Sequence, residues 1–179
     1  MKKKTLALIL ALVMVFGAAV GGTIAWLTDK TAEVKNTFTV GNINITLDET
    51  LPEGKTAKMV PGNEIDKDPK VTVKANSEAC WLFVKIDESS NLKNFISYTV
   101  DSGWTKLQDG VYYREVGATT TDVIYPVLTD NKVAVLTTVD KTAMDGLTEA
   151  TYPTLTFKAY AIQKDGFATA AAAWTEASK

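Results

Sequence analysis

The chain repeatedly alternates apolar and polar residues, and a period of two is typical of β-strands with one buried face. In segment 70–76, Val71, Val73 and Ala75 alternate with polar neighbours. Turn-forming residues separate such segments, and strands do not alternate with helices in a βαβ pattern. We therefore expect an all-β fold, an antiparallel sandwich of about seven to nine short strands. The candidate segments are 37–47, 70–76, 80–87, 96–100, 104–107, 111–116, 123–128, 132–139 and 154–162.

Glycine and proline refine this assignment. The apolar residues change parity around Gly41, so a bend or bulge is expected there. Asp109-Gly110 lies between two β-patterned runs and predicts a hairpin. Pro126 interrupts its apolar run, so we expect segment 123–128 to be an edge strand or a bulged segment. The charged segment 48–68 contains two prolines and two glycines, and we expect a long, exposed loop.

Helical spacing occurs mainly near the C-terminus. Phe167, Ala170, Ala171 and Trp174 recur at helical intervals, which predicts a short C-terminal helix that packs its aromatic side chains on the domain. A single helical turn is also expected over 142–147.

The first 25 residues have the three parts of a secretory signal peptide. Residues 2–4 are lysines, an apolar run follows to Val20, and the small residues Thr23 and Ala25 form a cleavage site. We expect signal peptidase to cut between Ala25 and Trp26 during export. The alternative is a retained membrane anchor, but the apolar run is shorter than the roughly 20 residues that a spanning helix needs. The mature protein would then have no membrane contact.

Cleavage would leave 154 of the 179 residues, enough for one domain with a substantial core. Three of the 19 basic residues would be lost and all 21 acidic residues kept, so the mature charge is about −5. A mildly acidic chain without a basic block argues against nucleic acid and anionic membranes as partners.

The composition excludes most catalytic chemistry. The chain has no His and one Cys, so it can assemble neither a Ser–His nor a Cys–His nucleophile, nor an HExxH zinc site. No glycine-rich phosphate loop of the P-loop or dinucleotide type occurs. We expect no enzyme activity, no catalytic residue, no cofactor and no metal site.

A group of carboxylates in segment 48–68 raises two functional alternatives, action on a glycosidic bond and calcium binding. A pair could act on a glycosidic bond, but a loop is a poor scaffold for that geometry, and a solvated acidic loop is the simpler interpretation. Whether the 48–68 loop binds calcium stays open, because hard cations take carboxylate oxygens although the EF-hand spacing is absent. The candidates are Asp48, Glu49, Glu53, Glu64, Asp66 and Asp68.

Segment 80–87 carries the lone thiol and two aromatic residues. Cys80 shares its parity with Leu82 and other apolar residues, so we expect a buried, unreactive side chain. Trp81 and Phe83, on the other face, form either an exposed binding platform or the inner side of a strand buried on both faces. We adopt the second interpretation.

Both ends of the chain carry a recognisable pattern. Gly22-Thr23-Ile24-Ala25 is followed by Trp26 and Asp29, and later come Asn36, Phe38, Gly41 and Ile43. Pro61-Gly62, Asp68-Pro69 and the closing TLTFKAYAIQKDGFATAAAAW also fit. In these features the chain resembles the TasA/camelysin family of Gram-positive secreted proteins, which a SipW-type signal peptidase processes. The likeness is loose between about Asn91 and Thr151, and Asp29 falls one residue later than in some members.

The resemblance implies a jelly-roll sandwich that assembles into extracellular biofilm fibres by donor-strand complementation. In that family the mature N-terminus of one subunit inserts as a strand into its neighbour. Here residues 26–36 would be the donor strand, with Trp26, Leu27 and Val34 as subunit contacts. The alternative is that residues 26–36 fold back on their own domain or stay disordered. Some members have been described as metalloproteases, but this chain lacks the residues for that activity.

The sequence therefore predicts four parts, a signal peptide (1–25), a donor-strand candidate (26–36), a β-sandwich (37–163) and a C-terminal helical segment (164–179). The expected function is a secreted structural protein of extracellular matrix or cell-surface fibres, with itself or related matrix subunits as partners. The alternative is a monomeric secreted β-sandwich that binds a glycan or a cell surface. Major or accessory fibre role, assembly trigger and any non-self partner are not determined by the sequence.

Overall fold

We describe a computed structural model of the chain for residues 41–50 and 57–179. These residues belong to one structural unit, Val40–Lys179. The predicted strand over 37–40 lies outside the described residues. The strands are β1 (Ile45–Asp48), β2 (Glu64–Asp66), β3 (Lys70–Val73), β4 (Cys80–Glu88), β5 (Ile96–Ser97), β6 (Thr105–Gln108), β7 (Val111–Val116), β8 (Val123–Pro126), β9 (Lys132–Val135) and β10 (Leu155–Gln163).

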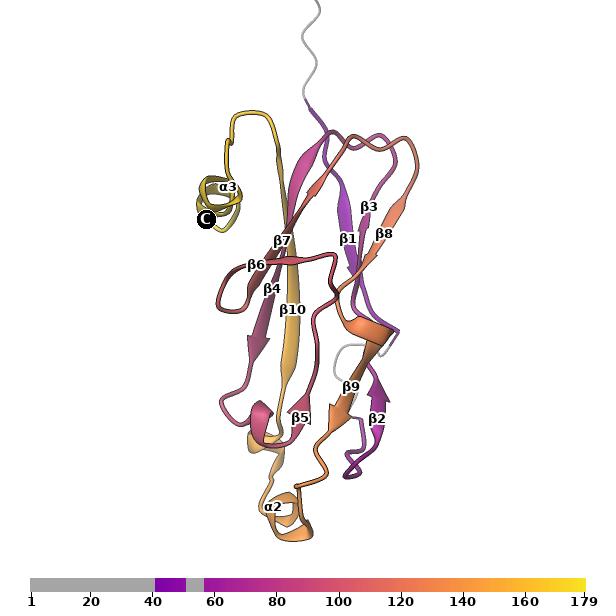
Figure 1. Cartoon of the computed structure of the whole chain (residues 1–179), viewed down its shortest axis with the longest axis vertical. Coiled ribbons are helices and arrows are strands. Elements are labelled where there is room, and N and C mark those ends of the chain that lie inside the picture. Colours follow the sequence, from indigo (N-terminus) through magenta and orange to yellow (C-terminus); the bar gives the residue numbers. More distant parts are fainter. Residues whose placement is uncertain (1–40, 51–56) are drawn as a thin grey trace, which may run out of the picture. The chain divides into compact units, whose positions relative to one another are not determined.

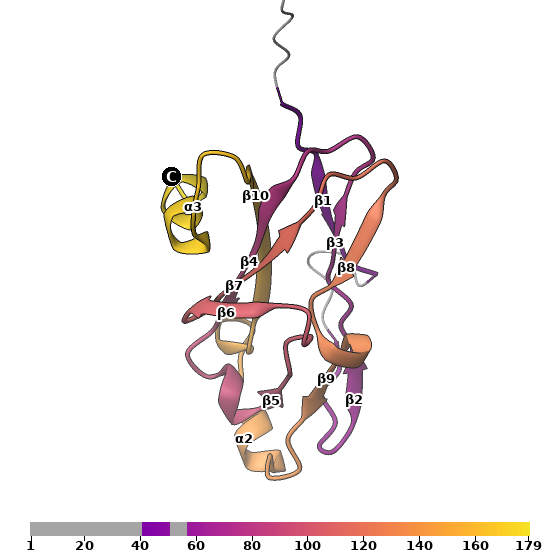
Figure 2. The same ribbon diagram turned by 45° about the horizontal axis from the view of Figure 1, so that its top comes forward.

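The described strands form three antiparallel sheets, which confirms the all-β prediction (Figure 1). A four-stranded sheet has the order β10-β4-β7-β6, and a three-stranded sheet has the order β1-β3-β8. A small third sheet, β2-β9-β5, lies below the other two in Figure 2. Helices are few and short among the described residues: α2 (Lys141–Asp145), α3 (Ala170–Ala177) and the 3₁₀ turns η1 (Leu92–Asn94), η2 (Thr129–Asn131) and η3 (Glu149–Thr151).

The main core lies between the four-stranded sheet and the β1-β3-β8 sheet. Successive side chains of a strand point to opposite faces, so one parity of β4 joins this core, where it meets Val71 and Val73 of β3. The inward residues of β4 are fully or almost fully buried and free of polar atoms that need partners, apart from the thiol of Cys80. Those residues are Cys80, Leu82, Val84 and Ile86.

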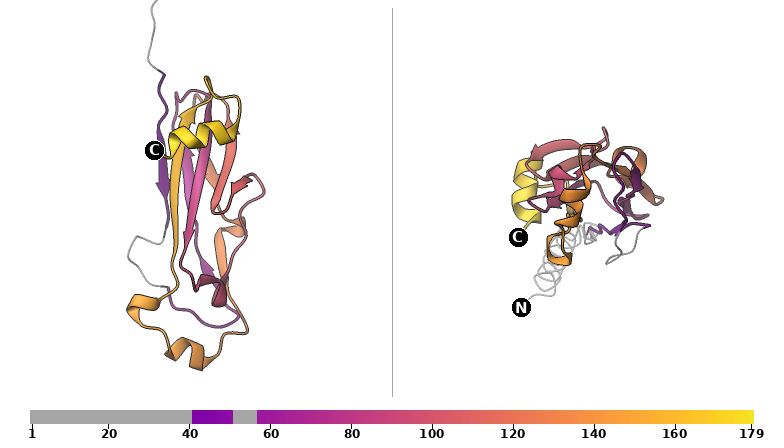
Figure 3. Two further views of the ribbon diagram at one scale, coloured as in Figure 1. Left: turned by 90° about the vertical axis from the view of Figure 1, so that its left-hand side faces the viewer. Right: turned by 90° about the horizontal axis from the view of Figure 1, so that it is seen from below.

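The helix α3 covers the opposite face of the four-stranded sheet (Figure 3, left). Thr169 caps its N-terminus by accepting a hydrogen bond from the backbone N–H of Ala172. Gly166, at a φ of 98°, lies in the turn that precedes the cap. The predicted C-terminal helix is therefore confirmed, but it begins at Ala170 rather than near Phe167 because this turn occupies the intervening residues.

Several local predictions are confirmed. The hairpin between β6 and β7 turns at Asp109-Gly110, with Gly110 at a φ of 70°. The segment with Pro126 forms β8, which is an edge strand. The predicted helical turn near residue 142 is α2, capped by Asp140.

The prediction of an exposed loop over 48–68 is wrong in part. Residues of this segment form β2, which pairs with β9 in the register Ile65↔Val133. Three residues with a single half-buried side chain give too short a pattern to be recognised as a strand. Segment 96–100 is also less regular than predicted, because β5 ends at Ser97 and only an isolated bridge, Val100↔Leu128, follows.

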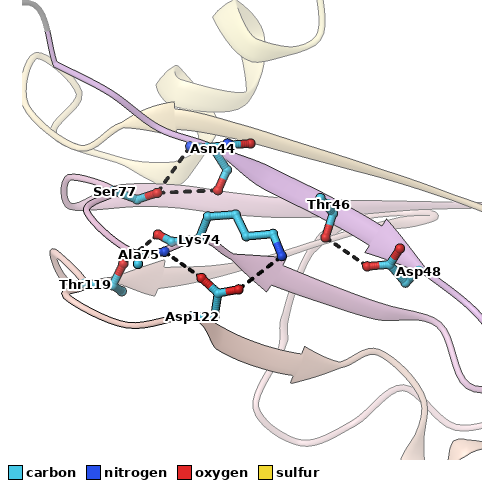
Figure 4. Close-up of polar contacts among 8 residues, drawn as sticks. All are labelled: Asn44, Thr46, Asp48, Lys74, Ala75, Ser77, Thr119 and Asp122. Carbon is cyan, nitrogen blue, oxygen red and sulfur yellow. Dashed lines mark hydrogen bonds and ion pairs between the residues drawn. The ribbon is translucent and has the colours of Figure 1, made fainter.

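A hydrogen-bonded turn holds the beginning of β1 (Figure 4). The backbone N–H of Asn44 donates to the Ser77 hydroxyl at 3.2 Å, and the Asn44 carbonyl accepts from the backbone N–H of Lys74 at 2.9 Å. Asp122 accepts from the backbone N–H of Ala75 at 2.8 Å and from the Lys74 ammonium at 3.1 Å. These contacts tie β1, the β3–β4 turn and the segment before β8 together at one end of the two main sheets.

Candidate functional site

The predicted site residues of the N-terminal segment lie outside the described residues. These are Ala25 and Trp26 at the cleavage site, and Trp26, Leu27 and Val34 as subunit contacts. The structure does show the surface that an added strand would meet, the free edges of the two main sheets.

The strand β10 has a long edge with no hydrogen-bonded partner in the described part of the chain. Its register with β4 is fixed at both ends, because the N–H of Ser89 donates to the Thr154 carbonyl and the N–H of Lys164 donates to the Ala79 carbonyl. In an antiparallel pair, alternate residues bond to the partner. The even-numbered residues of β10 therefore bond to β4, and the backbone groups of its odd-numbered residues point away. Those residues are Leu155, Phe157, Ala159, Ala161 and Gln163.

The strand β1 presents a second free edge beside β10. The bond from Lys74 N–H to the Asn44 carbonyl sets its register with β3, so the backbone groups of Ile45 and Leu47 point away from β3. The strands β1 and β10 belong to different sheets and lie side by side (Figure 3, left). We call this the β1/β10 side of the sandwich.

The side chains at the β1/β10 side face the core and are incompletely covered by the described residues. They pack against the buried core cluster, yet each retains some exposure to solvent. An added strand could cover these side chains and also satisfy the free backbone groups. The residues concerned are Ile45, Leu47, Leu155, Phe157, Ala159 and Ala161.

Trp81 and Phe83 are buried, which confirms the second of the two interpretations left open by the sequence. Trp81 is 8% exposed and its indole N–H donates to the Phe167 carbonyl at 3.2 Å. Phe83 is fully buried, and the ring of Trp174 from α3 lies 5.3 Å from its own. These two aromatic residues therefore offer no exposed binding platform.

The acidic residues of segment 48–68 are mostly engaged with lysines. Glu49 lies 2.7 Å from Lys67, and Glu64 lies 2.7 Å from Lys132. Glu53 lies outside the described residues. Part of the segment lines an open hollow, but no three His, Cys, Asp or Glu side chains among the described residues are grouped to hold a metal ion. The hollow is lined by Thr50, Asp66, Asp68, Asp130 and Asn131.

Asp68 has the most perturbed carboxyl group of this segment. Burial alone would raise its pKa, but hydrogen bonds from the Lys70 ammonium at 2.8 Å and from the Thr50 hydroxyl and N–H outweigh burial. Its pKa is thereby lowered to about 2. The group is therefore an ionised structural anchor at neutral pH.

Cys80 is fully buried, as its parity predicted. Burial raises the pKa of its thiol to about 11, because the thiolate would lose its hydration. This thiol is a packing residue of the core.

The sequence alone did not locate the β1/β10 side. The pattern of segment 154–162 predicts a strand, but a period of two does not say which strands are its neighbours. One signal was present: its core-facing residues become small at Ala159 and Ala161, whereas β4 keeps large residues at every inward position after Cys80.

Comparisons with known proteins add no relative, since no family model, curated protein or solved structure significantly matches the chain. Among the described residues, no helix is long and apolar enough to cross a membrane.

Proposed function

We propose that this protein is a secreted structural subunit that forms extracellular matrix or cell-surface fibres by donor-strand exchange. Residues 26–36 of one subunit would add as a strand to the β1/β10 side of the next. The observation that carries this proposal is the free edge of β10, nine residues long and adjacent to the free edge of β1. Long open edges are hazardous in a protein that remains monomeric, and natural proteins usually protect them.

The chemistry of the edge suits a strand as its occupant. Backbone groups of the odd-numbered β10 residues would supply hydrogen bonds of little side-chain specificity, and the half-covered apolar side chains would supply burial. Trp26, Leu27 and Val34 are the apolar residues of the donor segment that would provide this burial. Because donor and acceptor are different surfaces, the contact repeats head to tail without closing and gives a filament.

The remaining parts of the proposal come from the sequence. A signal peptide cut by signal peptidase between Ala25 and Trp26 would export the chain, and self or related matrix subunits would be its partners. The likeness to the TasA/camelysin pattern favours a jelly-roll arrangement of the two main sheets. No catalytic role is part of this proposal, since the chain has no His and its one Cys is buried.

The alternative, a monomeric glycan- or surface-binding module, lacks a supporting observation. Of the described large apolar residues, only Val60, Ile124 and Tyr152 are exposed, and they come from separate segments of the chain. The tryptophans of the described residues are at least partly buried.

Electron microscopy of purified chains tests the proposal. The chain beginning at Trp26, incubated at rising concentration, is expected to form filaments, and the chain beginning at Thr37 is expected to stay monomeric. If both remain monomeric, or if both polymerise equally, residues 26–36 are not the connector.

A pair of proline variants tests the acceptor edge. Ala159→Pro removes an N–H that points away from β4, so it is expected to abolish filaments of the chain beginning at Trp26 without breaking the sheet. Ile124→Pro is the matched control, because the register of β8 with β3 makes the Ile124 N–H point away from β3. Filaments from Ala159→Pro as abundant as those from Ile124→Pro would contradict an acceptor site at β10.

A further inference from the structure

The edge strands β6 and β8 form the opposite side of the sandwich. The backbone groups of these edges are better protected than those of the β1/β10 side. The N–H of Val127 donates to the Pro69 carbonyl, so Val123, Tyr125 and Val127 bond to β3 while Ile124 and Pro126 point away. Pro126 has no N–H to offer. The free side of β8 is therefore reduced mainly to the backbone groups of Ile124.

Trp104 occupies the Pro126 carbonyl, one of the two carbonyls on the free side of β8. Its indole N–H donates to the Pro126 carbonyl at 2.8 Å, and the residue is 6% exposed. The segment that leads to Trp104 also runs along the end of β8, where the N–H of Asp101 donates to the Val127 carbonyl and Val100 bridges to Leu128. The C-terminal end of this edge is thus covered by a crossing segment, and covering an edge strand is one way in which proteins protect it.

Arg114 joins the two sheets at this side. It is the only arginine of the chain, and its guanidinium carbon lies 4.1 Å from the ring centre of Tyr125 on β8 and 5.2 Å from that of Trp104. A Cβ atom at Gly103 would lie only 2.8 Å from one of its terminal nitrogens, so the guanidinium also lies against that backbone. No described carboxylate is within ion-pair distance of Arg114.

A strand that entered between the sheets here would have to displace this stack or bury the guanidinium without a direct ion pair. Both outcomes are unfavourable, because a desolvated and unpaired charge is costly. The strand β6 adds a further obstacle: it is four residues long and its register with β7 shifts between Lys106 and Gln108.

We propose that Trp104, Arg114 and Pro126 act as a latch that closes the β6/β8 side to strand addition. Each subunit then accepts one strand, at the β1/β10 side only, and the polymer grows as a single unbranched line. The inference rests on the proposed function for the identity of the incoming strand, residues 26–36, but the latch itself consists of described residues.

Peptide capture separates the two ideas. The acceptor is the chain beginning at Thr37, which retains the whole unit Val40–Lys179, and the probe is a labelled synthetic peptide of residues 26–36. Arg114→Met combined with Trp104→Phe removes the charge and the indole donor while it keeps side-chain bulk. Lys85→Met is the charge-matched control on β4. Near-UV circular dichroism checks that each variant keeps its packed core, and the two single substitutions replace the double variant if it unfolds.

We expect the parent and the control to bind about one peptide per subunit, and the latch variant about two. One peptide on both parent and variant would overturn the latch and leave the proposed function intact. Peptide on the variant but none on the parent would support the latch and contradict the proposed function. If neither chain binds the peptide, both ideas are overturned. Filaments of the full mature chain carrying the latch substitutions should branch or associate sideways.

Discussion

At the scale of single residues, the fold shifts the pKa of side chains that it shields from water. The pKa of Asp68 is lowered and that of Cys80 is raised. Hydrogen bonds hold the carboxyl group of Asp68 in its charged form, whereas the apolar surroundings of Cys80 hold its thiol in the neutral form.

The lowered pKa of Asp68 makes a pH-dependent contribution to stability. The folded pKa is about 2 and the ordinary value is 3.8, so the contribution is present above about pH 4 and is lost as the pH falls through 2. We expect Asp68→Asn to lower the free energy of unfolding by about 2 kcal/mol at pH 7 and to have little effect near pH 2. Urea unfolding at both pH values measures this difference.

Asp109→Asn is the control for that measurement. The Asp109 side chain is fully exposed, so its substitution should leave the unfolding free energy nearly unchanged at either pH. An equal loss for Asp68→Asn at pH 7 and pH 2 would show that the carboxylate charge is not responsible.

Cys80 should behave as an inert core residue. Its pKa of about 11 and its complete burial predict that a thiol reagent at pH 8 reacts with the unfolded chain in seconds to minutes but hardly at all with the folded chain. The reaction rate with and without denaturant is the measurement. Rapid labelling of the folded chain would mean that the core opens readily around β4.

At the scale of elements, the four-stranded sheet needs a cover on each face because the first half of β4, which includes Trp81 and Phe83, is apolar on both. The β1-β3-β8 sheet covers one face and α3 covers the other. The helix makes its main aromatic contacts through Trp174, whose ring lies 5.3 Å from that of Phe83 and 5.1 Å, edge-on, from that of Tyr160. A helix of eight residues would be marginal alone, so this packing stabilises it.

Trp174→Ala is therefore expected to destabilise the protein by about 2–3 kcal/mol, somewhat less than the loss of a fully buried tryptophan because the side chain is half-buried. It should also expose the aromatic face of the sheet and increase binding of a hydrophobic dye. Ala171→Ser, on the exposed side of the same helix, is the control. Unchanged dye binding in Trp174→Ala would contradict the role of α3 as the cover of this face.

At the scale of the whole molecule, the two sides of the sandwich differ in how well their edge strands are protected. The β6/β8 side carries Pro126, the Trp104 bond and the Arg114 stack, whereas the β1/β10 side leaves backbone groups and apolar side chains incompletely covered by the described residues. Under the proposed function, one open side and one closed side would leave each subunit a single acceptor site on its two main sheets, and the polymer would be linear.

Occupation of the open side should stabilise the subunit. The chain beginning at Thr37 is expected to melt at a higher temperature when the peptide of residues 26–36 is added, because a ligand that binds only the folded state shifts the equilibrium by mass action. The gain should be about 2.7 kcal/mol when the free peptide is at about 100 times its dissociation constant. A scrambled peptide is the control, and equal stabilisation by both would show that strand addition at this site lacks sequence preference.

Much of the fold was already set by local patterns in the sequence. Alternation predicted the strands, Asp109-Gly110 predicted the hairpin, and Pro126 predicted the edge strand, because each depends on backbone preferences and on residues close in the chain. The burial of Cys80 followed from parity in the same way. The composition alone removed histidine-dependent chemistry from consideration.

Only the tertiary structure decided which surfaces remain free. A period of two assigns a residue to one of two faces but does not name the neighbouring strand, which depends on contacts between residues far apart in the sequence. That is why the free edges of β1 and β10, the cover that α3 provides and the stack of Arg114 on Tyr125 were not visible in the pattern. The short strand β2 was missed for the same reason, since its pairing with β9 rather than its own three residues makes it a strand.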